Sequence, residues 1–324
     1  MKLLPVGLFL SLSVATYTLI KPNLGALRPP LREQCQAGLS PNFLPVTNTN
    51  FDKFLCVLIS LFHIGLEPES SPFMAYFFAT CLPAIMLFVS VESSRKGRRF
   101  IVSYAGLISG MFGQVLTVGV VLPIYWIYFI LSARRVKGKV TEAHAEASLF
   151  GVLIGWVVPS LALFTMPDPS VTAIFQIAPL ISFVCQFAHI VVRSPSTVSH
   201  SGFRTVQGAY IVIFIIASSM HLNTLMRFSS IEDFKSLFVP TLYASSIQSA
   251  AMNVFQVDFY ATVLGCLLAS LWFARSQAEV AKLAIWAVVG SLSFSPGAAF
   301  VAASLWRESY LEEALIAKEV IKKE

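Results

Sequence analysis

The sequence predicts an all-α protein, a polytopic transmembrane helical bundle with eight or nine spans. Of its 324 residues, 56% are hydrophobic and only 12% are charged, and the mean hydropathy is +0.73. Apolar stretches long enough to cross the roughly 30 Å of a bilayer's hydrocarbon layer recur along the chain. This composition is typical of a multi-pass membrane protein and excludes an ordinary soluble domain.

Windows of about 20 apolar residues locate the expected spans, because a helix rises about 1.5 Å per residue. They fall at residues 3–20, 51–66, 72–91, 101–132, 147–166, 171–192, 206–226, 254–274 and 280–305. The second span is short and contains His63, so it either tilts or enters and leaves on the same side. The fourth is too long for one straight helix, and we expect Pro123 to kink it.

The chain divides into four segments by composition. Residues 1–20 form a signal anchor or first transmembrane helix; Met1 and Lys2 precede its apolar run, and a weak cleavage site near Ala15 leaves a signal peptide as the alternative. A polar loop at 21–50, a transmembrane helical domain at 51–306 and a charged C-terminal tail at 307–324 follow. The tail mixes acids and lysines at helical spacing, which predicts a solvated helix.

The net charge of +6 does not indicate nucleic-acid binding, because the basic residues occur in short clusters beside apolar spans. Such clusters set membrane topology. With residues 21–50 and 92–100 in the cytoplasm, most Lys and Arg residues lie on that side, and the endoplasmic reticulum is the expected membrane. The five cysteines, at positions 35, 56, 81, 185 and 266, have no paired spacing. We therefore expect neither a disulfide framework nor structural zinc.

Several catalytic motifs are absent from the sequence. It contains no GxxxxGK[ST] phosphate loop, no HExxH zinc motif and no GxSxG nucleophile elbow. Its aspartates, at positions 52, 168, 233 and 258, are too scattered to form an aspartate-rich cluster that holds Mg²⁺ on a diphosphate. We expect a protein that works without a metal and without a cofactor.

Two acids, Glu92 and Asp258, lie in or beside long apolar stretches, and an ionisable residue at membrane depth indicates function. Each carboxyl must be neutral, paired or exposed to a cavity there, and a neutral carboxylic acid is a proton donor. Asp258 has no basic residue within fifteen positions, which favours a functional role. Glu92 precedes SSRKGRR, so an ion pair with Arg95 or Lys96 explains it equally well.

Aromatic residues make up 13% of the chain, and several occur in groups. Aromatic faces attract cations, and a dry aromatic wall protects a carbocation from water. Bundle packing and interfacial belts explain single rings equally well. Polar and aromatic side chains that we expect to position a substrate are Gln114, Tyr125, Trp126, Asn253 and Gln256. Interhelical hydrogen bonding is the alternative for the polar ones.

Five sequence patches follow one another between about residues 55 and 310: VESSRKG, GQVLTVGVVLPIYW, GWVVPSLAL, FQVDFYATVLG and SPGAAFVAASLWRE. With these patches the sequence resembles the small integral-membrane terpene cyclases of fungal meroterpenoid pathways, in particular the ascofuranone-type cyclases. The resemblance implies acid-initiated, metal-independent cyclisation of a prenylated aromatic or terpenyl epoxide without loss of diphosphate. We hypothesise that Glu92 or Asp258 is the general acid, and that the other orients it or acts as the terminal base.

The expected partners are a lipophilic prenylated small molecule and membrane lipid, but no nucleic acid. A pathway epoxidase or prenyltransferase in the same membrane is a further expected partner. The alternative function is a multi-pass proton- or cation-coupled small-molecule transporter that uses the same two acids. A transport path needs polar groups through the full membrane depth, whereas the strongest acids here collect near one face, which favours an enzyme. A scaffold or receptor-like protein that catalyses no reaction is the third and least favoured function.

Overall fold

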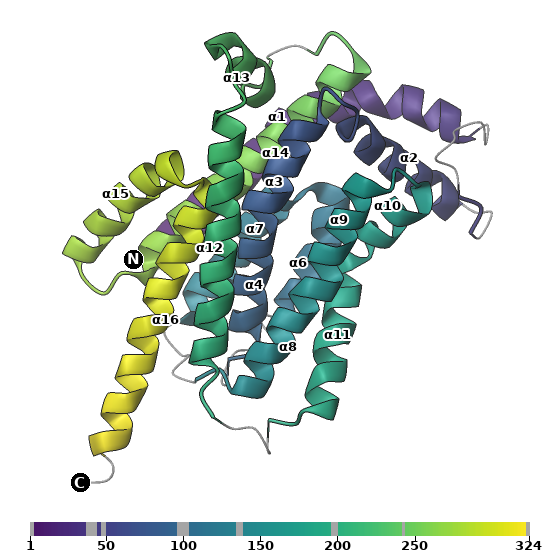
Figure 1. Cartoon of the computed structure of the whole chain (residues 1–324). Helices are drawn as coiled ribbons and strands as arrows, with labels where there is room; N and C mark the ends of the chain where they lie inside the picture. The colour runs from purple at the N-terminus through teal and green to yellow at the C-terminus, as the bar shows by residue number, and fades with distance from the viewer. Residues whose placement is uncertain are drawn as a thin grey trace.

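The computed structural model describes residues 3–36, 44–46, 50–95, 104–133, 139–195, 200–241 and 244–321 (Figure 1). Within these ranges every regular element is a helix, and the β pairing is limited to one isolated bridge between Thr141 and Ser201. The predicted all-α class is therefore confirmed for the part of the chain that the structure describes.

The helices follow one another with short connections. Their bounds are α1 (Leu3–Gln36), α2 (Asn50–Gly65), α3 (Ser71–Thr80), α4 (Leu82–Ser93), α6 (Ala105–Leu116), α7 (Val118–Ala133), α8 (Glu142–Val152), a π-helical turn (Leu153–Val157), α9 (Val158–Thr165), α10 (Pro169–Gln176), α11 (Ala178–Val192), α12 (Phe203–Leu225), α13 (Ile231–Phe238), α14 (Ile247–Ser270), a 3-10 turn (Leu271–Phe273), α15 (Gln277–Ser293) and α16 (Pro296–Ile321).

Five helical stretches are long and apolar enough to cross a membrane. They are Leu3–Gln36, Ser71–Ser93, Glu142–Thr165, Phe203–Leu225 and Ile247–Phe273. Helices α10 and α11 form a sixth if they count as one span, although they are bent by 60°. An integral membrane protein with several apolar helices is thus supported, whereas the expected eight or nine spans stay a prediction.

Two of the predicted spans break at a residue with a positive φ. The stretch at 101–132 breaks at Thr117, which has a φ of 76°, while α7 continues through Pro123. The stretch at 280–305 breaks between α15 and α16 at Ser295, which has a φ of 118°. Residues with a side chain rarely adopt positive φ, so each break holds the backbone in a conformation that a continuous helix does not use.

Helix α1 extends to Gln36, well into the segment expected to be a polar loop. Three prolines and several charges at 21–36 are typical of a loop, but Leu27, Leu31 and Cys35 recur every four residues and bury one face. Near the N-terminus, Phe9 is also buried, and the Ser13 hydroxyl donates to the carbonyl of Val120 on α7 at 2.7 Å. Helix α1 is packed into the bundle along its length.

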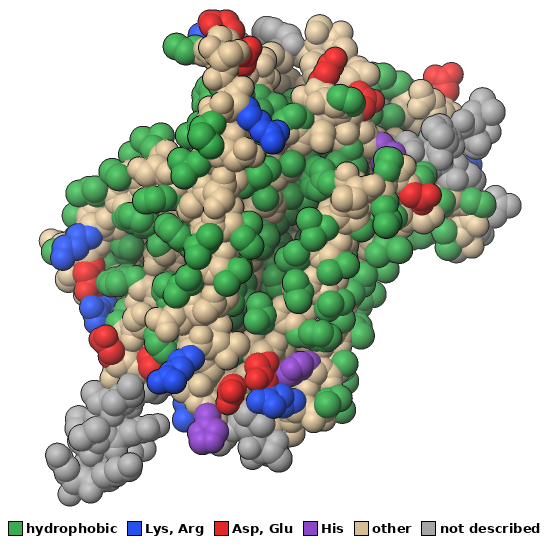
Figure 2. All heavy atoms as spheres, in the orientation of Figure 1, with side chains coloured by type: hydrophobic (Ala, Val, Ile, Leu, Met, Phe, Trp, Pro, Cys, Tyr) green, Lys and Arg blue, Asp and Glu red, His purple; other side chains and the backbone are tan. Residues whose placement is uncertain are grey.

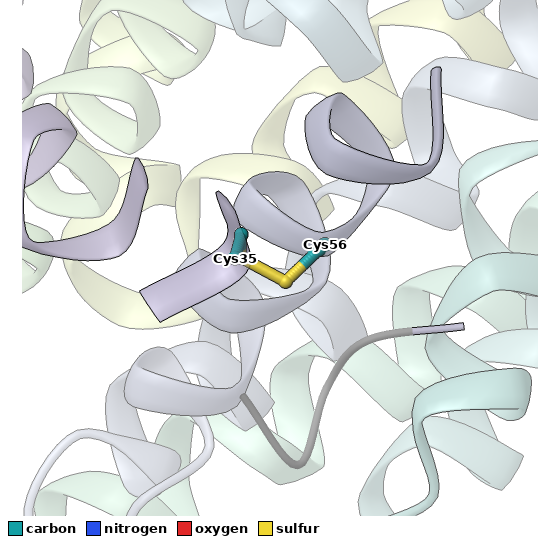
Figure 3. Close-up of a disulfide and its surroundings, with 2 residues drawn as sticks. All are labelled: Cys35 and Cys56. Carbon is teal, nitrogen blue, oxygen red and sulfur yellow. A yellow bond between two sulfur atoms is a disulfide. The ribbon is translucent and has the colours of Figure 1, made fainter. Parts of the chain in front are cut away.

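A disulfide joins Cys35, at the end of α1, to Cys56 in α2 (Figure 3). The expectation that the cysteines form no disulfide was therefore wrong for this pair. The sequence gives no sign of it because the two residues are 21 positions apart and Cys56 lies inside an apolar run. Only the return of α2 against α1 brings their Cα atoms to 5.9 Å.

The visible surface is divided by polarity. Charged side chains gather toward opposite ends of the molecule, and the surface between them is mainly hydrophobic (Figure 2). Large apolar side chains such as Val192, Ile285 and Leu292 are more than half exposed. Such a broad exposed apolar surface is the side that an integral membrane protein presents to lipid.

Candidate active site

An apolar cavity of about 80 Å³ lies among α1, α2, the α3–α4 run, the α6–α7 junction, α10 and α14. Six of its lining residues are aromatic: Phe62, Phe77, Phe78, Trp156, Phe175 and Phe255. Only three lining side chains are polar, namely Gln114, Thr117 and Asp258. Asp258 is the one acid in a largely apolar wall.

Asp258 is placed in the cavity wall by the buried face of α14, and only 6% of the residue is exposed. Its Oδ1 atom accepts a hydrogen bond from the backbone N–H of Gly119 at 2.5 Å. The Val118 backbone also interacts with the carboxyl, and the Thr117 side chain lies in the same cavity wall. All of these groups are uncharged, so no basic side chain in the described part of the chain holds Asp258 as an ion pair.

The break between α6 and α7 produces this arrangement. Because α7 starts afresh at Val118, its first backbone amides are free of partners within the helix and point toward α14. A Cβ atom on Gly119 would lie 2.7 Å from the backbone oxygen of Asp258 and 2.9 Å from Oδ1. Only glycine permits so close an approach. The helix N-terminus therefore lies where it stabilises negative charge on the carboxylate.

Aromatic rings form the wall on the other sides of the cavity. The ring of Phe62 lies 5.5 Å from that of Phe175 and 5.7 Å from that of Phe255. Phe78 and Phe175 are also in contact, with ring centroids 5.3 Å apart. Rings packed in this way exclude water and offer π-faces to a cation inside the cavity.

Gln114, on α6, is the second predicted residue that lines this cavity. Its Nε2 atom donates to the carbonyl of Phe175 over a long distance of 3.4 Å. Such a weak bond leaves the amide free to turn toward a polar atom of a bound molecule. Gln114 and Asp258 thus line the same cavity.

Glu92 lies elsewhere, near the end of α4 and fully buried. Leu82 on the same helix lines the cavity, and its separation of ten positions from Glu92 corresponds to about 15 Å of helix. The Glu92 carboxylate bonds Arg95, and it also bonds Arg307 at 2.6 Å and 3.2 Å. Arg95 in turn bonds Glu308. Glu92 is thus part of a buried four-residue charge network, which we call the α4–α16 charge network.

The other predicted positioning residues serve contacts between helices. Trp126 is fully buried, and its ring contacts those of Phe88 on α4 and Phe300 on α16. The side-chain oxygen of Asn253 accepts the backbone N–H of Thr241 at 2.9 Å. The Gln256 amide donates to the carbonyl of Leu237 at 2.8 Å. Tyr125, Trp126, Asn253 and Gln256 are not part of the wall of the Asp258 cavity.

Thr117 and Gly119 are the site residues that sequence reasoning missed. Two signals in the sequence point to them: the apolar run at 101–132 is too long for one helix, and a glycine follows closely after the only glutamine in that run. Neither signal places the break at Thr117 or pairs Gly119 with Asp258. That pairing depends on the packing of α7 against α14.

These features are those of an integral membrane protein of apolar helices with one carboxyl in the wall of an aromatic cavity. The chain matches the CtvD domain over residues 33–311, and it therefore belongs to the CtvD domain family. This family is related to fungal meroterpenoid and terpene cyclases, so the chain is a membrane protein related to terpenoid biosynthesis. No curated protein and no solved structure matches the chain.

Proposed function

We propose that this chain is a membrane-bound terpene cyclase that carries out a metal-independent, acid-initiated cyclisation of a prenylated aromatic or terpenyl epoxide. The observation that carries the proposal is Asp258, the one carboxyl in the wall of an aromatic cavity, bonded there by uncharged groups alone. An acid in such surroundings is poised to give a proton to a weakly basic atom of a lipophilic substrate.

The reaction follows from the two oxygens of the Asp258 carboxyl. Oδ1 accepts the Gly119 N–H, so Oδ2 is left to carry the proton. That proton passes to the epoxide oxygen, the C–O bond to the more substituted carbon breaks, and positive charge develops on that carbon. The π electrons of a neighbouring alkene then form the new C–C bond and close a ring. The amides at the start of α7 stabilise the carboxylate that remains.

The cavity wall supports the later steps. The six aromatic rings stabilise the migrating positive charge and keep water away from it. The Asp258 carboxylate is the strongest base among the lining residues, so it can accept the proton whose loss ends the cascade, which restores the acid. Gln114 would orient a polar atom of the substrate. The product has the same elemental composition as the substrate.

The Cys35–Cys56 disulfide supports an endomembrane location, because disulfides persist in oxidising compartments such as the lumen of the endoplasmic reticulum. We propose that the end of the bundle with this disulfide faces the lumen. Figure 1 shows α2 and the end of α1 at the opposite end of the bundle from the end of α4. The α4–α16 charge network then lies toward the cytosolic end of the bundle. Residues 21–36 lie toward the lumen, whereas the sequence interpretation put them in the cytoplasm.

The proposal is tested by incubating membranes that contain the protein with epoxidised farnesyl-aryl compounds and following the products by chromatography and mass spectrometry. We expect a product of unchanged mass and altered retention, formed at the same rate with and without EDTA. Loss of activity in EDTA would contradict a metal-free mechanism. No conversion across a broad panel of such epoxides, with folded protein present, would contradict cyclase activity and favour the transporter alternative.

A further inference from the structure

The wall of the Asp258 cavity is not equally buried on all sides. Its inner residues, such as Phe77 and Phe175, are buried. The accessible part of the lining lies on α1, α2 and the α6–α7 junction: Leu24, Leu58 and Leu61 are partly exposed, and Val115 is 52% exposed. The cavity therefore opens to the outside of the bundle between α2 and α6. We call this opening the mouth.

The surface around the mouth is apolar. Helix α6 has no charged residue, and Ile108 and Phe112 are exposed on the same side of it as Val115, because they are spaced by four and three residues. Phe112 is 56% exposed. A mouth that opened into water would expose these side chains at a free-energy penalty, whereas a mouth that opens into lipid buries them.

We propose that the substrate, a prenylated aromatic molecule dissolved in the bilayer, enters the cavity sideways from the hydrocarbon layer through this mouth, with Val115 at its edge. The substrate class rests on the proposed function. A prenyl chain partitions into hydrocarbon, so a lateral mouth receives it without its transfer through water. The cavity of about 80 Å³ is smaller than the few hundred Å³ of typical small-molecule sites, so entry must displace side chains at the mouth.

Two tryptophan substitutions on α6 test the mouth. Val115→Trp adds bulk to a residue that lines the cavity, whereas Phe112→Trp changes the exposed ring one turn earlier, which is not part of the wall. The probe is a farnesyl phenyl ether that carries a diazirine on the ring, added to vesicles containing the protein. After irradiation, mass spectrometry measures the labelling of the peptide that contains Phe77 and Phe78.

We expect Val115→Trp to reduce this labelling at least ten-fold and Phe112→Trp to leave it within two-fold of the unchanged protein. Val115→Ala, which removes atoms from the mouth, should label faster. This variant decides the outcome if the larger substitution does not fold. Equal labelling in Val115→Trp and the unchanged protein, or no acceleration in Val115→Ala, would overturn lateral entry through this mouth.

The labelling needs no cyclisation, so the two proposals fail separately. Labelling that depends on Val115 in a protein that converts no epoxide would contradict the cyclase and leave the lateral mouth standing. Conversion of an epoxide by a protein whose labelling is indifferent to Val115 would overturn the mouth and leave the cyclase standing.

Discussion

At the scale of single residues, the two acids that the sequence set apart occupy different surroundings. The Asp258 carboxyl interacts with backbone amides at a cavity, whereas the Glu92 carboxylate forms ion pairs with two arginines in a buried charge network. The guanidinium of Arg307 also lies 5.2 to 5.7 Å from the ring centres of Phe88, Phe129 and Phe273. A carboxylate held by two cations is a poor proton donor, so we assign Glu92 to the structure of the bundle and Asp258 to chemistry.

Glu92→Gln should therefore lower stability more than it lowers catalysis. Removing one partner from a buried ion pair typically costs about 3–5 kcal/mol, because the remaining charges lose their compensation. We expect a clear drop in the melting temperature of the purified protein, with activity per folded molecule within a few-fold of the original. A Glu92→Gln protein that melts normally and has no activity would instead give Glu92 a catalytic role.

At the scale of elements, the break between α6 and α7 determines the site. A continuous helix through 105–133 would satisfy the amides of Val118 and Gly119 internally and leave none for Asp258. Thr117, with its positive φ, interrupts that pattern. The sequence predicted that this apolar run could not be one straight helix but assigned the irregularity to Pro123. The effect of a proline on a helix can be predicted from the sequence, because its ring removes one backbone hydrogen bond. The strained backbone of Thr117 could not be predicted in this way, because its position depends on contacts with α14.

Gly119→Ala should separate α7 from Asp258. The Cβ of the alanine would lie 2.7 Å from the backbone oxygen of Asp258, so α7 must move away. The hydrogen bond from the backbone N–H at position 119 to Oδ1 is then lost. Loss of one positioned donor to a developing oxyanion typically lowers kcat by about 10²–10³. We expect a loss at the lower end of that range in the conversion of an epoxide.

The matched control is Gly208→Ala on α12, where an added Cβ would find nothing within 4 Å. This variant should keep its activity and melting temperature. If both glycine variants are as active as the unchanged protein, the amides at the start of α7 do not contribute to catalysis.

At the scale of the whole molecule, charge is concentrated toward two ends and the surface between them is apolar (Figure 2). The apolar windows of the sequence predicted this arrangement, since they located most of the helices. The sequence interpretation put residues 21–50 and 92–100 on the same side of the membrane, whereas the end of α1 and the end of α4 lie at opposite ends of the bundle (Figure 1). The disulfide between Cys35 and Cys56 is formed by the return of α2 to α1, which no local pattern indicates.

The proposed orientation predicts where glycosylation occurs. An Asn-x-Thr acceptor introduced into the segment that joins α1 and α2 should be glycosylated in microsomes, because that segment follows the disulfide-bonded end of α1. The same acceptor in the segment that joins α4 and α6 should stay unmodified. Gel mobility before and after glycosidase treatment measures both. The opposite pattern would place the disulfide in the cytosol and contradict the orientation.

The most direct test of the central claim compares the unchanged protein with Asp258→Asn, at equal amounts of folded protein, in the conversion of a farnesyl-aryl epoxide in EDTA. Asparagine keeps the shape of the side chain and can still accept the Gly119 N–H, but it has no acidic proton to give. We predict unchanged folding and a rate at least two orders of magnitude lower, in keeping with the loss of a general acid. An Asp258→Asn protein that forms the cyclised product at the original rate would contradict the assignment of Asp258 as the acid.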